Sequence, residues 1–143
     1  MSQAAPAPRY ALRVLPDLLA IVRLDPSQPL PAWATVSAGL SSVTRTAREL
    51  SIVCPISAVP AAVPRDQRQW RAFEFTEDLD FALVGVLAAI AAPLAAAGIS
   101  IFAISTHDTD YVLVEDDQLS AAIAALRAQP HRFEISTGDV GAG

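Results

Sequence analysis

The segment Ser105–Asp110 is a run of polar side chains that could contact a small ligand. An aspartate such as Asp108 or Asp110 could bind a ligand ammonium group through a charge-assisted hydrogen bond. The hydroxyl groups of Ser105 and Thr106 could bind the same ligand, or they could satisfy the backbone at the end of a strand. Aspartate is also favoured in ordinary polar turns, where it bonds to its own backbone. The residues alone leave both interpretations open.

Nothing in the sequence indicates catalysis or metal binding. His107 and His131 are the two histidines, and no cysteine–histidine cluster accompanies them. Cys54 is the single cysteine and lies in an apolar segment, so we expect an inert core thiol and no intramolecular disulfide. Phosphate-binding glycine loops and Gly-x-Ser-x-Gly motifs are missing. We therefore expect a protein that is not an enzyme and that has no metal and no cofactor.

The charge of the chain argues against nucleic acid and membranes as partners. The formal net charge is -5, and the ten basic residues form no basic run. Residues 81–106 carry no charge and are long enough to span a bilayer, but acidic residues flank them and Pro93 and Gly98 divide them. We therefore expect a soluble protein. A single cysteine and the lack of a secretory signal indicate a cytoplasmic location.

The second half of the chain predicts the element order β-α-β-β-α-β. A strand at Trp70–Phe75 precedes a helix that begins near Ala82 and ends at Gly98, a glycine placed as the C-cap. Two strands follow, joined by a polar hairpin, and then a second helix that Asp116 or Asp117 could cap. A last strand follows Pro130. The helices should bury two stripes of residues: Leu83, Leu87, Ile90 and Leu94 in the first, and Leu119, Ile123 and Leu126 in the second.

The first half repeats this order in a degraded form. The predicted elements are a short strand near 12–15, a strand at 18–24, one or two helical turns at 30–36, a hairpin of 42–46 with 50–54, and at most one helical turn at 59–63. The fold class expected is α+β, with two ferredoxin-like units packed side by side. Residues 9–64 would form the degraded N-terminal unit and residues 65–135 the C-terminal unit. Residues 1–8 and 136–143 would be flexible tails.

Several segments resemble the ACT domain family. Residues 97–114, which include Ser105-Thr106-His107-Asp108-Thr109-Asp110-Tyr111, are similar to the second strand pair of an ACT domain. Further matches are Leu79-Asp80-Phe81 leading to Gly85-Val86-Leu87, Ser42–Thr46, Glu49–Pro55 and Trp70-Arg71, so the resemblance covers most of residues 12–128. The similarity is to small bacterial ACT proteins, the animal cytosolic arginine sensors and, more distantly, aspartate kinase regulatory regions.

The resemblance implies a ligand site at the junction of two ACT units. The ligand loop of the family corresponds to Asp80, Phe81, Ala82, Leu83, Val84 and Gly85, and the facing strand corresponds to Ile104, Ser105, Thr106, Asp108 and Asp110. Amide groups at the start of the helix would bind a ligand carboxylate. Gly85 would permit close approach either of a ligand or of a packed helix.

Two functions follow from these expectations. The first is a regulatory ACT protein that binds a small molecule, an amino acid, and controls a partner protein that the sequence does not name. The alternative is a ligand-free ACT-fold module for dimerisation or interaction. In both cases we expect a homodimer in a bacterial cytoplasm.

Overall fold

Within the residues that the structure describes, the chain folds into an eight-stranded sheet with two α-helices. The structure is a computed structural model that describes residues 9–35, 38–77 and 85–137. Its strands are β1 (Tyr10–Val14), β2 (Leu19–Leu24), β3 (Ser42–Arg45), β4 (Leu50–Pro55), β5 (Trp70–Phe75), β6 (Phe102–Ser105), β7 (Asp110–Glu115) and β8 (Phe133–Ser136). Its helices are α1 (Val86–Ala96) and α2 (Leu119–Arg127), with short 3-10 turns at Ala32–Ala34, Ile56–Ala58 and Asp116–Gln118. None of the helices in these ranges is long and apolar enough to cross a membrane.

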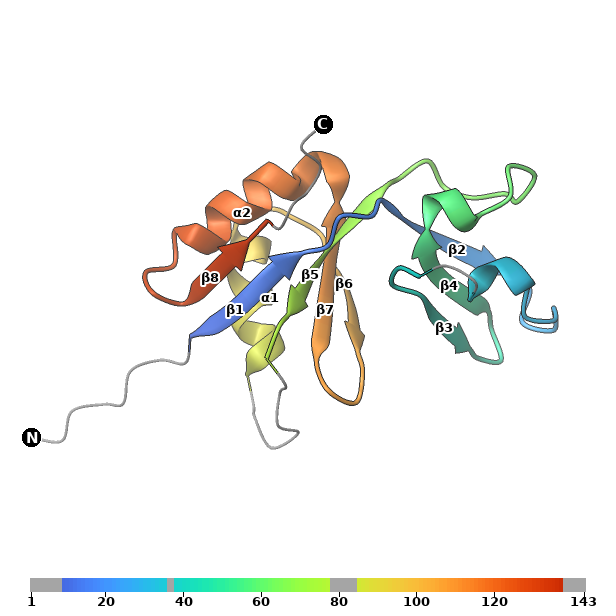
Figure 1. The fold of residues 1–143 in the computed structure, drawn as a ribbon, viewed down its shortest axis with the longest axis horizontal. Coiled ribbons are helices and arrows are strands. Elements are labelled where there is room, and N and C mark those ends of the chain that lie inside the picture. Colours follow the sequence, from blue (N-terminus) through green and yellow to red (C-terminus); the bar gives the residue numbers. More distant parts are fainter. Residues whose placement is uncertain (1–8, 36–37, 78–84, 138–143) are drawn as a thin grey trace, which may run out of the picture.

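The C-terminal portion of the sheet has the strand order β8-β1-β5-β7-β6, with α1 and α2 on one face (Figure 1). Its most N-terminal strand, β1, pairs antiparallel with β5 and parallel with β8. We expected this short strand to belong with the first-half strands, and that assignment of the strand was wrong. The alternation of buried Leu12 and Val14 with exposed Arg13 predicts a strand, but it does not indicate which strands lie beside it.

The N-terminal portion consists of β2, β3 and β4, and its hairpin repeats the C-terminal one. Arg45 pairs with Leu50 in the β3–β4 hairpin, and Ser105 pairs with Asp110 in the β6–β7 hairpin, so equivalent residues are 60 positions apart. The two turns also match. The amide of Thr46 donates to the carbonyl of Glu49 at 2.9 Å, and that of Thr106 donates to the carbonyl of Thr109 at 2.8 Å.

The two portions meet where β2 touches β5. Ala20 pairs with Cys54 in β4 and Arg71 pairs with Val114 in β7, so β2 corresponds to β5 with a displacement of 51 residues. The only β2–β5 partners in the described ladder, Leu19 and Trp70, are therefore equivalent to each other. An antiparallel contact between equivalent residues relates the two portions by a local two-fold rotation.

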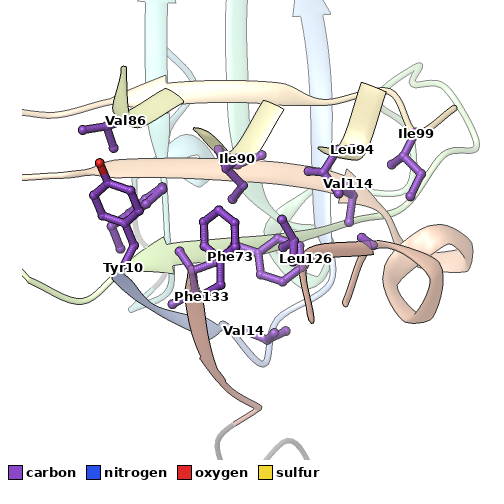
Figure 2. Close-up of a cluster of buried hydrophobic side chains, with 14 residues drawn as sticks. Tyr10, Val14, Phe73, Val86, Ile90, Leu94, Ile99, Val114, Leu126 and Phe133 are labelled. Carbon is purple, nitrogen blue, oxygen red and sulfur yellow. The ribbon is translucent and has the colours of Figure 1, made fainter. Parts of the chain in front are cut away.

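In the described part of the chain, three clusters of buried apolar side chains hold these elements together. The helix core fills the space between the C-terminal strands and the helices, and includes Phe73, Ile90 and Leu126 (Figure 2). A second cluster covers the outer face of β2 and β4 and includes Cys54. The third, which we call the junction core, joins the opposite faces of the two portions and contains Leu19, Val53, Trp70, Ala72 and Leu113.

The first helix ends as the sequence predicts. Gly98 has φ +75°, its amide donates to the carbonyl of Ala95, and the amide of Ile99 donates to that of Leu94 at 2.9 Å. These two bonds are a Schellman motif, which needs a residue in the left-handed region and so favours glycine. The helix tolerates Pro93 in its interior. Its predicted beginning near Ala82 lies outside the described residues.

Local details differ from expectation at the element ends. The helical turn at 30–36 is one 3-10 turn at Ala32–Ala34, and the turn expected at 59–63 lies earlier, at Ile56–Ala58. Asp116 and Asp117 lie in a 3-10 turn before α2, and neither Glu115 nor Gln118 caps these helices with a side chain. Ser136, which we assigned to the tail, belongs to β8.

Candidate functional site

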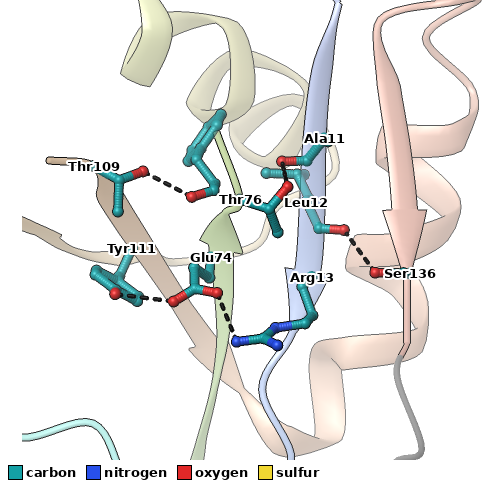
Figure 3. A network of polar contacts seen from close by, with 9 residues as sticks. Ala11, Leu12, Arg13, Glu74, Thr76, Thr109, Tyr111 and Ser136 are labelled. Atoms are coloured by element: carbon teal, nitrogen blue, oxygen red, sulfur yellow. Dashed lines mark hydrogen bonds and ion pairs between the residues drawn. The ribbon is translucent and has the colours of Figure 1, made fainter. Parts of the chain in front are cut away.

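The hairpin turn that joins β6 to β7 lies at the C-terminal end of β5. Thr109 Oγ1 donates a hydrogen bond of 2.8 Å to the carbonyl of Phe75, the last residue of β5 (Figure 3). Thr106 Oγ1 accepts from the amide of Thr109 at 3.3 Å and lies 3.1 Å from its carbonyl. Of the two roles left open for Thr106, the structure shows the backbone role. The bond to Phe75 places the turn beside the start of the loop that leads to α1.

The predicted acidic residues lie at this end of the sheet and differ in exposure. Asp108 Oδ1 is 2.9 Å from His107 Nδ1, and their side chains are 71% and 87% exposed. Asp110 opens β7 opposite Ser105 and is half-buried. Ile104 packs against the junction core, whereas Ser105 is exposed. The residues predicted for the facing strand are therefore brought together along the hairpin, with Asp110 the less solvated acid.

The predicted ligand loop is described only at its last residue. Asp80, Phe81, Ala82, Leu83 and Val84 lie outside the described residues. Gly85 immediately precedes α1 with φ +81°, and a Cβ atom built there would meet none of the described residues within 4 Å. The left-handed backbone at this position favours glycine. Figure 1 shows that α1 begins at the same end of the sheet as the β6–β7 hairpin.

A polar network crosses the helix-free face of the C-terminal portion. Arg13 Nη2 lies 2.8 Å from Glu74 Oε1, and the hydroxyl of Tyr111 donates to Glu74 Oε2 at 2.9 Å (Figure 3). Burial and the bond to Glu74 raise the pKa of Tyr111 above its ordinary value. Sequence reasoning missed this network, because Arg13 lies opposite Glu74 only once β1 is inserted beside β5.

A cavity of about 700 Å³ lies between the two portions of the sheet. Its charged lining residues are Arg23, Glu49, Arg65, Asp66 and Arg68, and its apolar ones include Ile21, Trp70, Ile101 and Phe102. Sequence reasoning also missed this cavity, because its lining residues come from segments that lie far apart in the sequence. The signal available was the cluster of charges at 65–68 immediately before a strand.

The charges in this cavity are held in different ways. Arg68 lies 2.7 Å from Asp66 and stacks 5.5 Å from the ring centre of Trp70, and its hydrogen bond lowers the pKa of Asp66. Arg23 Nη2 donates to the carbonyl of Arg48 at 2.9 Å. Arg65 Nη1 is buried with no hydrogen-bond partner among the described residues. Within the same ranges, no cluster of three or more histidine, cysteine or acidic side chains could hold a metal ion.

Comparison with known proteins identifies the family. A sequence-family model described as an ACT domain matches residues 66–128, and a model described as an N-terminal domain matches residues 17–62. A solved protein from Agrobacterium tumefaciens is 37% identical, with a TM-score of 0.81 over 91% of this chain and 96% of its own. The chain belongs to the ACT domain family. No curated protein matches it.

More distant solved structures share the fold of this ACT protein. A Vibrio cholerae protein of unknown function, described as a possible transport protein, is 18% identical with a TM-score of 0.68, over 82% of this chain and 88% of its own. An aspartokinase structure of alpha and beta subunits is also 18% identical, with a TM-score of 0.57 over 84% of this chain and 97% of its own. At this identity the likeness shows the fold alone.

Proposed function

We propose that this ACT protein is a regulatory module that binds a small molecule, an amino acid, at the junction of ACT units. The observation that carries the proposal is the matched β3–β4 and β6–β7 hairpins, related by a local two-fold rotation where Leu19 meets Trp70. We interpret the two portions as two ferredoxin-like units, the first degraded, divided near residue 64. Strand β1 is the exception, since it lies among the C-terminal strands.

The ligand site that we propose consists of the loop 80–85 and residues 104–110. Two observations on the described part support it. The turn is bonded to the end of β5, so the hairpin and the loop leave the sheet at the same end. Gly85 turns the chain into α1, whose first amide groups have no partners within the helix. An amino acid carboxylate would bind these amides, and Asp110 or Asp108 would bind its ammonium group.

The alternative is a ligand-free module for dimerisation or interaction. It is favoured by the turn itself, because Thr106 and Thr109 already use their hydroxyl groups within the protein. In either case we propose a non-enzymatic cytoplasmic protein that acts as a homodimer, with a regulated partner of unknown identity.

Thermal unfolding separates the two proposals. Ligand-free protein, verified by mass spectrometry, is melted with each of the twenty amino acids at millimolar concentration. A ligand at about a hundred times its Kd adds roughly 2.7 kcal/mol, which raises Tm by about 5–10 °C in a chain of this size. We expect one selective shift, reduced in Asp110→Asn or Asp108→Asn and retained in the exposed control Asp117→Asn. No shift with any amino acid favours the interaction module.

A further inference from the structure

Two cavities flank the contact between β2 and β5, and the repeat makes them equivalent. The large one, of about 700 Å³, is lined by Ser51 and Ser100. The small one, of about 370 Å³, is lined by Tyr111 and Leu40. Tyr111 lies 60 positions after Ser51 and Leu40 lies 60 positions before Ser100, so each is the repeat equivalent of one of the two serines. Two serines thus stand where the equivalent cavity has two large side chains. The larger cavity is therefore the one with the smaller side chains at these two positions.

The two cavities also differ in whether their polar side chains have hydrogen-bond partners. In the small cavity, Glu74 accepts hydrogen bonds from both Arg13 and Tyr111. Arg65 lines the large cavity, and within the described part of the chain its guanidinium group has no hydrogen bond or ion pair. An arginine without a partner can bind an anion, and a carboxylate fits the geometry of its guanidinium group.

The remaining lining residues define the kind of anion. Three arginines and two acidic residues line the cavity, which leaves a net charge of +1. A monoanion balances this charge, whereas a phosphate dianion would exceed it and approach Glu49 and Asp66. Ile21, Ile101, Phe102 and Trp70 provide an apolar surface beside the arginines. The volume lies within the range of small-molecule sites, which is about 300–1,000 Å³.

We propose that the cavity between the two portions binds an organic monocarboxylate with an apolar or aromatic body, and that Arg65 binds its carboxylate. The apolar body lies along Ile101 and Phe102, next to Trp70. The described lining residues of this cavity include neither Gly85 nor any of residues 104–110 of the proposed amino-acid site. It would let the protein respond to a second small molecule at the point where its two portions meet.

The test uses 4-phenylbutyrate as the probe and its neutral amide as the matched control. The two tryptophans give separate indole N–H signals in an ¹⁵N spectrum of the full chain. Trp70 lines the cavity, and Trp33 packs in the cluster on the outer face of β2 and β4. We expect the carboxylate to shift the Trp70 signal saturably while that of Trp33 stays fixed. The amide should bind at least tenfold more weakly.

Variants decide which residues form the site. Arg65→Gln should raise Kd for the carboxylate at least tenfold, and Arg127→Gln, an exposed arginine on α2, should leave it unchanged. Ser100→Leu should narrow the cavity, because Leu40 lies at the equivalent position of the smaller one. This variant leaves Arg65 in place, so it tests the site even if Arg65→Gln fails to fold. The proposal is overturned if the probe leaves Trp70 unshifted, if the amide binds equally well, or if Ser100→Leu binds like the unmodified chain. Asp110→Asn should leave probe binding unchanged, so this result is independent of the proposed amino-acid site.

Discussion

The junction core should decide whether the two portions of the sheet unfold together. Leu113 is fully buried there, on β7, in a cluster that contains Leu19 and Val53 from the N-terminal portion and Trp70 from β5. Leu113→Ala removes three carbon atoms. At about 0.8 kcal/mol for each buried methylene group, the transfer loss is about 2.4 kcal/mol. The cavity left behind brings the expected loss of unfolding free energy to about 2–5 kcal/mol.

Urea and thermal unfolding measure this loss, followed by tryptophan fluorescence and circular dichroism. We expect one cooperative transition with an unchanged urea m-value and a Tm lower by about 4–20 °C, from roughly 2–4 °C for each kcal/mol in a chain of this size. The control is Leu18→Ala, since Leu18 is 39% exposed and should change stability by less than about 0.5 kcal/mol. A loss below about 1 kcal/mol for Leu113→Ala, or two separate transitions, would refute a shared core.

Three further predictions concern single residues. Gly98→Ala places a side chain at φ +75° after α1 and should cost about 1 kcal/mol in urea unfolding, while the neighbouring exposed Ala97→Gly lacks this backbone strain. Burial and Glu74 raise the pKa of Tyr111 above 10.0, so the neutral phenol stabilises the native state below about pH 10. This contribution is lost as the pH rises further, and Tyr111→Phe should therefore flatten the alkaline loss of unfolding free energy. Identical pH profiles of stability for the variant and the unmodified protein would contradict the assignment. Burial raises the pKa of Cys54, so native protein at neutral pH should resist alkylation by iodoacetamide and react fully once unfolded; fast labelling of the native state would contradict its burial.

The elements that were predicted well are those fixed by neighbouring residues. The strand Trp70–Phe75 follows from alternation, and the end of α1 follows from the one residue type that adopts the conformation at Gly98. The hairpin around Thr106–Thr109 follows from a polar link between two apolar runs. In each case the signal and the structure that it specifies lie within a few residues of one another.

Features that depend on distant parts of the chain were not predictable in the same way. The place of β1 requires partners at Phe75 and Phe133, more than sixty residues away in the sequence. The cavity with Arg65 requires β2 and β6 to approach each other, and no local pattern encodes that approach. The candidate amino-acid site came instead from resemblance to a family, and its described residues lie together at one end of the sheet.

The most direct test of the central claim is to locate the residues that contact a bound amino acid. Ligand-free, ¹⁵N-labelled protein is titrated with each of the twenty amino acids, and the backbone amide shifts are assigned. The proposal predicts that one amino acid shifts the amides of Gly85, Thr106 and Asp110 saturably, with the same Kd at each. If no amino acid shifts these amides, or if all saturable shifts map elsewhere, the protein does not bind an amino acid at this site.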